Sequence, residues 1–137
     1  MAVERTLILC KPDAVERRLV GEIVGRLERR AYAIVEMRMM LLDEKRARRH
    51  YAEHEGKSFF DELVRFITSG PLVAMAVEGE SAIDGCRQTI GATEPLNAAP
   101  GSVRADFATS IGRNLVHASD SAQSAQRELA IFFGESG

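Results

Sequence analysis

Residues Asn114–Ser121 (NLVHASDS) join an apolar pair to a lone histidine and then to a run of small polar residues. From Ala122 onward apolar residues recur at helical spacing, so either Asp120 or Ser121 is predicted to cap a C-terminal helix. His117 is therefore expected between a short strand and a helix N-terminus. Backbone N–H groups and the helix dipole at such a junction favour a negatively charged group.

Two further side chains make His117 a candidate for nucleophilic or acid–base chemistry. Glu128 lies about a turn and a half into the predicted helix, close enough to support a polar chain that runs through Ser119 to the imidazole. A histidine with a neighbouring hydroxyl and carboxylate suits both kinds of chemistry. A surface histidine is the simpler interpretation of the octapeptide alone, and a catalytic role needs support from other parts of the chain.

The composition indicates one globular domain that spans residues 1–137. Apolar residues make up 45% of the chain and charged residues 28%, and the net charge of -2 argues against nucleic acid as the main partner. Cys10 and Cys86 lie in apolar surroundings, where buried free thiols are expected, as in a reducing cytoplasm. The sequence has no signal-peptide pattern and no stretch of membrane-spanning length, so a cytoplasmic protein is expected.

Hydrophobic periodicity predicts four strands that alternate with helices. These strands with helices on one face predict a ferredoxin-like α/β (α+β) sandwich, in which helices cover a four-stranded antiparallel sheet. A long segment without a clear pattern, typical of a functional loop, precedes the last strand. In chain order the predicted elements are a strand at Thr6–Cys10, a helix at Val20–Leu27, a strand at Val35–Leu41, helices at Asp43–Glu53 and Phe60–Ile67, a strand at Leu72–Val77, a helix at Ile83–Ile90, the loop Ala92–Gly112, the strand before His117 and the C-terminal helix.

Two motifs that suggest other chemistries do not fit. Gly56-Lys57-Ser58 resembles the end of a phosphate-binding P-loop, but Tyr51 stands where that motif needs its first glycine. His50 and His54 have the spacing of helical metal ligands, yet the glutamate of the zinc-protease motif is absent between them. Neither a P-loop nor a zinc site is therefore predicted.

Scattered cations and hydrogen-bond donors remain, and they suit phosphoryl transfer, which depends on positioning and on neutralising spread negative charge. Each has a structural alternative; the stem of Arg87, for example, could simply cover the core. The members of this set are Lys11, His54, Arg87, Thr93 and Arg104.

At this point the chain resembles a nucleoside diphosphate kinase over essentially its whole length. Several independent motifs in the right order make the resemblance specific. They are Thr6–Asp13 (TLILCKPD), Tyr51–Phe60 (YAEHEGKSFF), Thr68–Pro71 (TSGP), Glu78-Gly79, Gly91–Pro95 (GATEP), Pro100–Phe107 (PGSVRADF) and Asn114–Ser121 (NLVHASDS).

The resemblance implies a ping-pong reaction between nucleoside triphosphates and diphosphates. His117 would take the γ-phosphoryl group on Nδ1, with Ser119 and Glu128 as orienting partners. An unperturbed histidine, with a pKa of about 6.5, is mostly neutral at cytosolic pH and can attack. Mg²⁺ would bridge nucleotide oxygens without direct protein ligands.

Roles in nucleotide binding also follow from the resemblance. Lys11 and Asn114 would bind the sugar 3′-hydroxyl, and Tyr51 would pack beside Lys11 and the histidine. Phe59 would stack on the base, with Ile111 on its other face, which tolerates every base because no base edge is read. The phosphates would be held by Arg87, Thr93, Arg104 and His54.

The family resemblance further implies a homo-oligomer, a tetramer or a hexamer built from dimers, with the exposed strand Val35–Leu41 as part of the dimer contact. Ala118 departs from the family pattern, which has glycine after the catalytic histidine. If that position needs a positive φ, the methyl group is unfavourable by on the order of 1 kcal/mol. A nucleotide-binding regulatory module, with transfer impaired by Ala118, is therefore the alternative.

Overall fold

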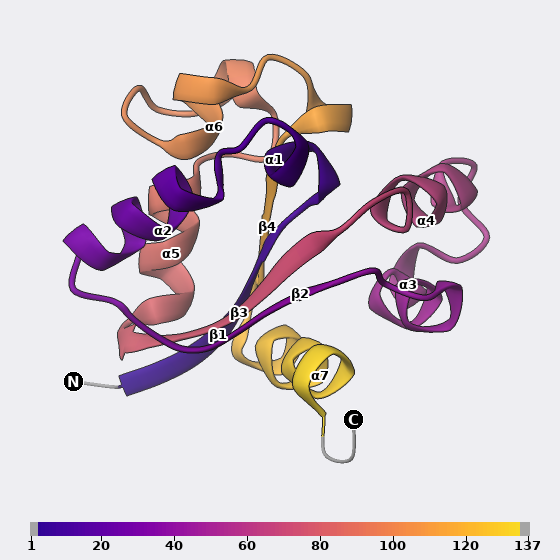
Figure 1. Ribbon diagram of the computed structural model, residues 1–137, viewed down its shortest axis with the longest axis horizontal. Helices are drawn as coiled ribbons and strands as arrows, with labels where there is room; N and C mark the ends of the chain where they lie inside the picture. Colours follow the sequence, from indigo (N-terminus) through magenta and orange to yellow (C-terminus); the bar gives the residue numbers. More distant parts are fainter. Residues whose placement is uncertain (1–2, 135–137) are drawn as a thin grey trace.

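The sheet has four antiparallel strands in the order β2-β3-β1-β4 (Figure 1). The computed structural model describes residues 3–134. β1 lies in the centre, and β4 pairs with it only through three residues, so the short last strand depends on β1 for its position. The strands are β1 (Val3–Cys10), β2 (Ala33–Met40), β3 (Leu72–Glu80) and β4 (Val116–Ala118). The predicted fold class and sheet are confirmed, although β4 includes His117, which was expected after the strand.

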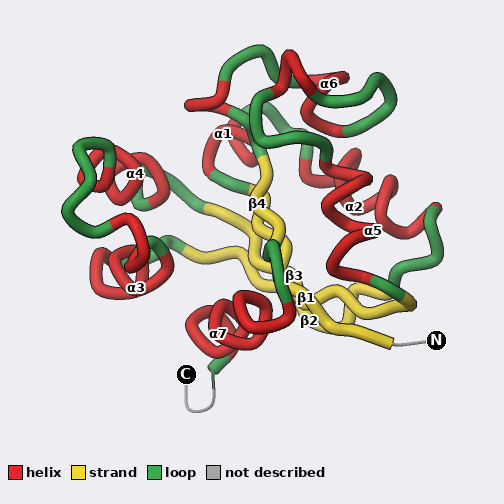
Figure 2. The backbone as a smooth tube through the Cα atoms, turned by 180° about the vertical axis from the view of Figure 1, so that it is seen from behind, coloured by secondary structure: helices red, strands yellow, loops and turns green. Residues whose placement is uncertain are grey.

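Helices cover both faces of the sheet, so the expectation of helices on one face is wrong. In Figures 1 and 2, α2 and α5 lie on one side of the strands, whereas α3, α4 and α7 lie on the other. The helices are α1 (Pro12–Glu16), α2 (Val20–Arg29), α3 (Glu44–His50), α4 (Phe60–Ile67), α5 (Ala82–Ile90), α6 (Val103–Phe107) and α7 (Ala122–Phe133), with 3₁₀ turns at Ala52–His54, Pro95–Asn97 and Ile111–Arg113.

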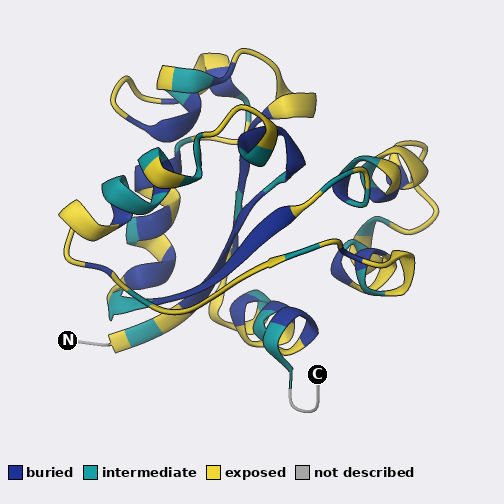
Figure 3. Ribbon diagram, in the orientation of Figure 1, coloured by how far each residue is buried: buried dark blue, intermediate teal, exposed yellow. Residues whose placement is uncertain are grey.

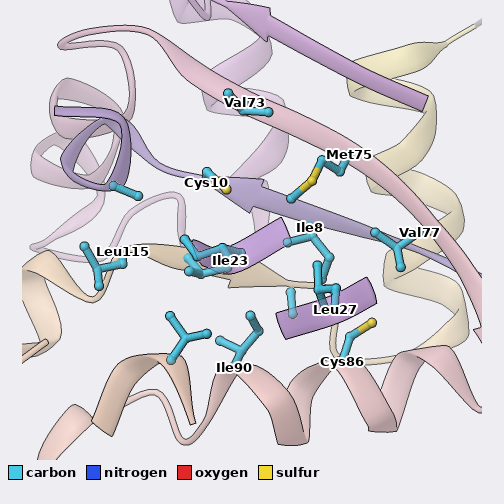
Figure 4. Packing of buried hydrophobic residues seen from close by; sticks show 14 of the residues in the cluster. Ile8, Cys10, Ile23, Leu27, Val73, Met75, Val77, Cys86, Ile90 and Leu115 are labelled. Carbon is cyan, nitrogen blue, oxygen red and sulfur yellow. The ribbon is translucent and has the colours of Figure 1, made fainter. Parts of the chain in front are cut away.

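The physical reason for the two-sided cover is the burial of the central strands on both faces. Successive residues of β1 point to opposite faces, and Leu7, Ile8 and Leu9 are all fully buried. Ile8 packs in one hydrophobic cluster with residues of α2 and α5, part of which Figure 4 shows, such as Leu27 and Ile90. Leu7 and Leu9 belong to the opposite cluster, with residues of α3, α4 and α7.

β2 is an edge strand with an apolar surface. Its residues are mostly exposed, as the burial colouring of Figure 3 shows. Met37 is 48% exposed, Met39 63% and the following Leu41 71%. An exposed edge with large apolar side chains is prone to pair with another chain.

Local capping signals place several helix ends where the sequence predicts them. Asp43 accepts a hydrogen bond from the backbone N–H of Arg46 at the start of α3. Ser121, one of the two candidate caps, accepts from the N–H of Ser124 at the start of α7. α5 ends at Ile90, and the following Gly91, with a φ of 100°, caps it.

The predicted loop Ala92–Gly112 contains more structure than expected. Ser102 caps the one-turn helix α6 by accepting a hydrogen bond from Ala105 N. Elements of five residues are too short for a visible hydrophobic period, which is why the sequence pattern missed α6 and α1. Within residues 3–134, no helix combines the length and the apolar character that a membrane span requires.

Candidate active site

His117 lies in the middle of β4, opposite Leu9 of β1. Its side chain is 26% exposed, and its Nε2 atom lies 2.8 Å from Oε1 of Glu128 on α7. The hydroxyl of Ser119 donates a hydrogen bond of 2.6 Å to the same carboxylate oxygen. Glu128 therefore contacts the imidazole and the hydroxyl directly, whereas the sequence interpretation wrongly placed Ser119 between them.

The electrostatics of this triad determine which nitrogen of His117 is free. Burial by itself raises the pKa of Glu128, but the hydrogen bonds from His117 and Ser119 and the electrostatic attraction of the imidazole outweigh it, so the pKa lies below its ordinary value. An ionised carboxylate only accepts hydrogen bonds, so Nε2 of His117 carries the proton. Nδ1 then keeps its lone pair and can act as a nucleophile.

The turn before β4 is held by the end of β1 and by α1. Leu115 is fully buried and has a φ of 75°, which is unusual for a residue with a Cβ. Its backbone N–H donates to Oδ2 of Asp13 at 3.0 Å, and its carbonyl accepts from the N–H of Lys11 at 2.9 Å. Asp13 thus has a positioning role that no sequence pattern assigned to it.

Lys11 and Asn114 are neighbours, as predicted. The Lys11 ammonium donates to Oδ1 of Asn114 at 2.5 Å, and Nδ2 of Asn114 donates to the carbonyl of Thr93 at 2.9 Å. Burial lowers the pKa of Lys11 to about 8; Asp13 raises it and Arg104 lowers it further. The ammonium is therefore mostly charged at neutral pH and loses its proton as the pH rises through that value.

The two predicted arginines differ in how they are held. Arg87, on α5, is exposed and donates to the carbonyl of Ala118 at 3.2 Å. Arg104, on α6, is buried, and it donates hydrogen bonds to three backbone carbonyls around the start of β4. These acceptors belong to Gly91, Asn114 and Val116. Burial, and then the charge of Arg87, lower the pKa of Arg104 to about 10. Both cations thus lie beside β4, but Arg104 also holds the backbone together.

The candidate base-binding residues come from two loops. Phe59, just before α4, is 44% exposed, and Ile111 is 57% exposed. The ring of His54 lies 5.4 Å from that of Phe59. Arg113 lies in the same turn as Ile111, and its Cζ atom is 5.1 Å from the ring centroid of Phe66 on α4. The turn that contains Ile111 therefore lies next to α4, and Phe59 directly precedes this helix. Such proximity is required if Phe59 and Ile111 are to contact the same base.

His50 lies next to His117, although its spacing to His54 indicated only a metal site that the sequence did not support. It ends α3 and is only 3% exposed, and its ring lies edge-on to that of His117, with centroids 4.6 Å apart. Burial, followed by repulsion from His117, lowers the pKa of His50 to about 3, so its imidazole is neutral. Tyr51 packs against His50 at 4.7 Å. Burial, followed by the charges of Glu128 and Asp13, raises the pKa of the Tyr51 hydroxyl. No local pattern placed His50 beside His117, since this proximity depends on the packing of α3 against α7.

Ala118 is accommodated without strain. It lies in β4 opposite Ile8, and its φ is not positive, in contrast to that of Leu115. Its side chain is buried. The concern that a methyl group at this position distorts the loop after the histidine is therefore wrong for this chain.

Comparisons with known proteins show the family to which the chain belongs. A family model described as nucleoside diphosphate kinase matches residues 4–137. The nucleoside diphosphate kinase of Frankia casuarinae is 58% identical over 133 residues, which are 97% of each chain. The structure of the Halobacterium salinarum enzyme in complex with CDP is 48% identical, with a TM-score of 0.94 over 98% of this chain and 90% of that one. The Aquifex aeolicus enzyme is 44% identical, with a TM-score of 0.93 over 96% of each chain. The chain therefore belongs to the nucleoside diphosphate kinase family, whose members are enzymes that transfer phosphate between nucleotides.

Proposed function

We propose that residues 1–137 act as one domain that moves the γ-phosphoryl group of a nucleoside triphosphate to a nucleoside diphosphate through a phosphohistidine at His117. Nδ1 attacks the γ-phosphorus, the bond to the β–γ bridging oxygen breaks, and the diphosphate leaves. A β-phosphate oxygen of the second nucleotide then attacks the same phosphorus and breaks the N–P bond. The hydrogen bond between Nε2 and Glu128 is the observation that carries this proposal, because it leaves Nδ1 unprotonated.

Cations around β4 would stabilise the transferring phosphate. Arg87 is exposed and contacts the residue next to His117, so it is well placed to bind a phosphate that reaches the imidazole. Arg104 would attract the phosphate mainly through its charge and not through hydrogen bonds, since its N–H groups already donate to backbone carbonyls. Thr93 and His54 would complete the phosphate contacts.

The sugar would be held by Lys11 and Asn114, whose side chains are already in contact. An ammonium and an amide that share one hydrogen bond can both reach a single hydroxyl, here the 3′-hydroxyl. Tyr51 would close the side of this pocket next to the histidine.

Nucleotide kinases generally use a divalent metal, and we propose Mg²⁺ carried by the phosphates. Glu128 is already engaged by His117 and Ser119, and Oδ2 of the buried Asp13 accepts a hydrogen bond from the N–H of Leu115. Mg²⁺ prefers oxygen ligands in an octahedron, and nucleotide phosphates and water supply them. When bound, the ion would neutralise phosphate charge, while the protein residues position the nucleotide.

Incubation with γ-labelled ATP and Mg²⁺ tests the mechanism. Label that is stable to alkali, labile to acid and removed by an added nucleoside diphosphate is the expected result. A chain that binds ATP but takes up no label would contradict the proposal and would fit the regulatory module, which the family comparisons do not favour.

Replacing Ala118 with glycine is expected to leave the rate of phosphate transfer nearly unchanged. Since the backbone there is extended and the methyl group is buried, the change should lower the free energy of unfolding by about 1 kcal/mol. Chemical denaturation and single-turnover labelling measure the two quantities. A transfer rate several times higher in the variant would restore the idea that Ala118 impairs the enzyme.

Replacing Phe59 with alanine is expected to raise KM on the order of tenfold for every nucleotide alike. A single stacked base contributes about 1–3 kcal/mol without reading a base edge, and Phe59 is partly exposed in the free protein. Steady-state kinetics with purine and pyrimidine diphosphates, in ribo and deoxy forms, measure the effect, and Phe59→Tyr is the matched control. A selective loss for one base would contradict non-selective stacking.

The expected oligomer would use the exposed edge strand β2. Its side chains Met37 and Met39 remain uncovered in the single chain, which supports pairing of two copies along this edge. A tetramer or hexamer would then form from such dimers. A cytoplasmic location suits the nucleotide substrates and the two buried free cysteines.

A further inference from the structure

His50 carries two polar atoms that have no use in the proposed reaction. Both of its ring nitrogens are buried and lack a hydrogen-bond partner. The ring is enclosed by other aromatic side chains, with Phe132 at 5.4 Å and His117 at 4.6 Å between centroids. A buried polar atom without a partner is unfavourable by about 1–3 kcal/mol, so a group that binds one of these nitrogens would gain that energy.

Two other ligand atoms lie close to this ring. One atom each of His50, His117 and Glu128 fall within 4.8 Å of one another. Zinc binds histidine nitrogen at about 2.0–2.1 Å and carboxylate oxygen at about 2.0–2.2 Å in a tetrahedron, which places neighbouring ligand atoms roughly 3.4 Å apart. Side-chain rotations that move these atoms by about 1 Å would therefore close the site.

We propose that His50, His117 and Glu128 form a binding site for a zinc-class transition-metal ion, with a water molecule as the fourth ligand. Two imidazoles and one carboxylate are a donor set typical of zinc. Mg²⁺ prefers oxygen ligands and would not compete, so this site is distinct from the ion that accompanies the nucleotide.

The surroundings allow the ion to enter and the ligands to turn. Access runs past His117, the most exposed of the three side chains. Nη2 of Arg127 lies 3.6 Å from Oε2 of Glu128. The positive charge of this guanidinium therefore lies beside the carboxylate oxygen that does not contact His117. The ion would replace the hydrogen bond between Glu128 and Nε2. The lone pair on Nε2 would bind the ion, and exchange with water would leave the single proton of the neutral imidazole on Nδ1.

A metal bound here would inhibit phosphoryl transfer, because it would hold the imidazole away from the orientation that Glu128 now gives it. This consequence depends on the proposed role of His117 as nucleophile. Binding of the ion does not depend on that role, since it requires only the three ligand side chains.

Spectroscopic titration of the nucleotide-free chain with Co²⁺ tests the site without an activity measurement. One Co²⁺ per chain, with the visible absorption of tetrahedral cobalt that Zn²⁺ but not Mg²⁺ displaces, is the expected result. Strong charge-transfer absorption from a thiolate would instead show that cysteine holds the metal and would overturn the proposal. Cys10 and Cys86 are buried, and burial raises the pKa of each to about 12, so thiolate binding is not expected.

His50→Phe is the decisive variant because it keeps a ring in the buried position and removes both nitrogens. Its affinity for Co²⁺ should fall on the order of 100-fold or more, since the loss of a residue that only supports a metal ligand already lowers affinity about 10- to 100-fold. His54→Phe is the matched control and should bind Co²⁺ as the wild type does. Unchanged affinity in His50→Phe would overturn the site, and His117→Gln provides the same comparison if the first variant does not fold.

Labelling with γ-labelled ATP in the presence of Zn²⁺ tests the inhibition, with each variant compared with its own metal-free rate. Wild type should be inhibited at zinc concentrations that leave His50→Phe active. If no label appears even without zinc, the proposed reaction fails, while the cobalt titration still decides the metal site.

Discussion

Replacing His117 with alanine is expected to abolish phosphate transfer, with a fall in rate on the order of 10⁴-fold or more. The reaction passes through a covalent bond to Nδ1, and no other described side chain has an equivalent nitrogen hydrogen-bonded to Glu128. Removal of the nucleophile therefore eliminates both half-reactions at once. Incorporation of label from γ-labelled ATP and its release to a diphosphate measure the two half-reactions separately.

His117→Gln is the matched control for the loss of the side chain. The glutamine amide can still donate to Glu128 and fills most of the volume of the imidazole, but it is not a nucleophile. The glutamine variant should therefore retain the melting temperature of the wild type and be as inactive as the alanine variant. Label that persists in either variant would place the phosphoenzyme on another residue.

Replacing Arg104 with alanine is expected to lower both the stability and the rate of transfer. The side chain is 7% exposed and satisfies three backbone carbonyls that flank β4. Loss of these partners in a buried environment should lower the free energy of unfolding by about 2–4 kcal/mol. For a chain of this length, such a change lowers the melting temperature by on the order of 10 °C.

Arg87→Ala is the comparison that separates the loss of a positive charge from the loss of fold stability. Arg87 is exposed and makes one hydrogen bond, to the carbonyl of Ala118, so its removal should change the melting temperature by only about 2 °C while it slows phosphorylation. Calorimetry gives the melting temperature of each variant, and single-turnover labelling gives its rate of phosphorylation. Equal melting temperatures would show that the carbonyl contacts of Arg104 contribute little to the fold.

The sequence predicts the elements best where a local pattern matches a local cause. The caps at Asp43 and Ser121 follow from side-chain oxygens that accept backbone N–H groups, and these interactions need no information from distant residues. The continuous apolar run Leu72–Val77 indicates a central strand, and continuous burial also implies cover on both faces. The order of helices along the chain does not assign each helix to a face of the sheet, and for this reason the prediction of helices on one face was wrong.

The site was harder to predict because its contacts join distant residues. The motifs identify His117, Lys11 and Asn114 through the family resemblance, and the structure brings the last two into contact. The position of His50 depends on how α3 packs against α7, which no spacing rule gives. The direct bond from Glu128 to His117 likewise depends on the angle at which α7 leaves β4.

β4 is a three-residue strand whose only partner in the described sheet is the buried centre strand β1. Its neighbour Ser119 also donates its backbone N–H to the carbonyl of Leu7. The backbone that carries the imidazole is therefore rigid, because local fraying of β4 would have to break its contacts with the buried part of β1. On heating, catalytic competence and the native structure should disappear in one cooperative transition, and amide hydrogen exchange along β4 should be as slow as along β1.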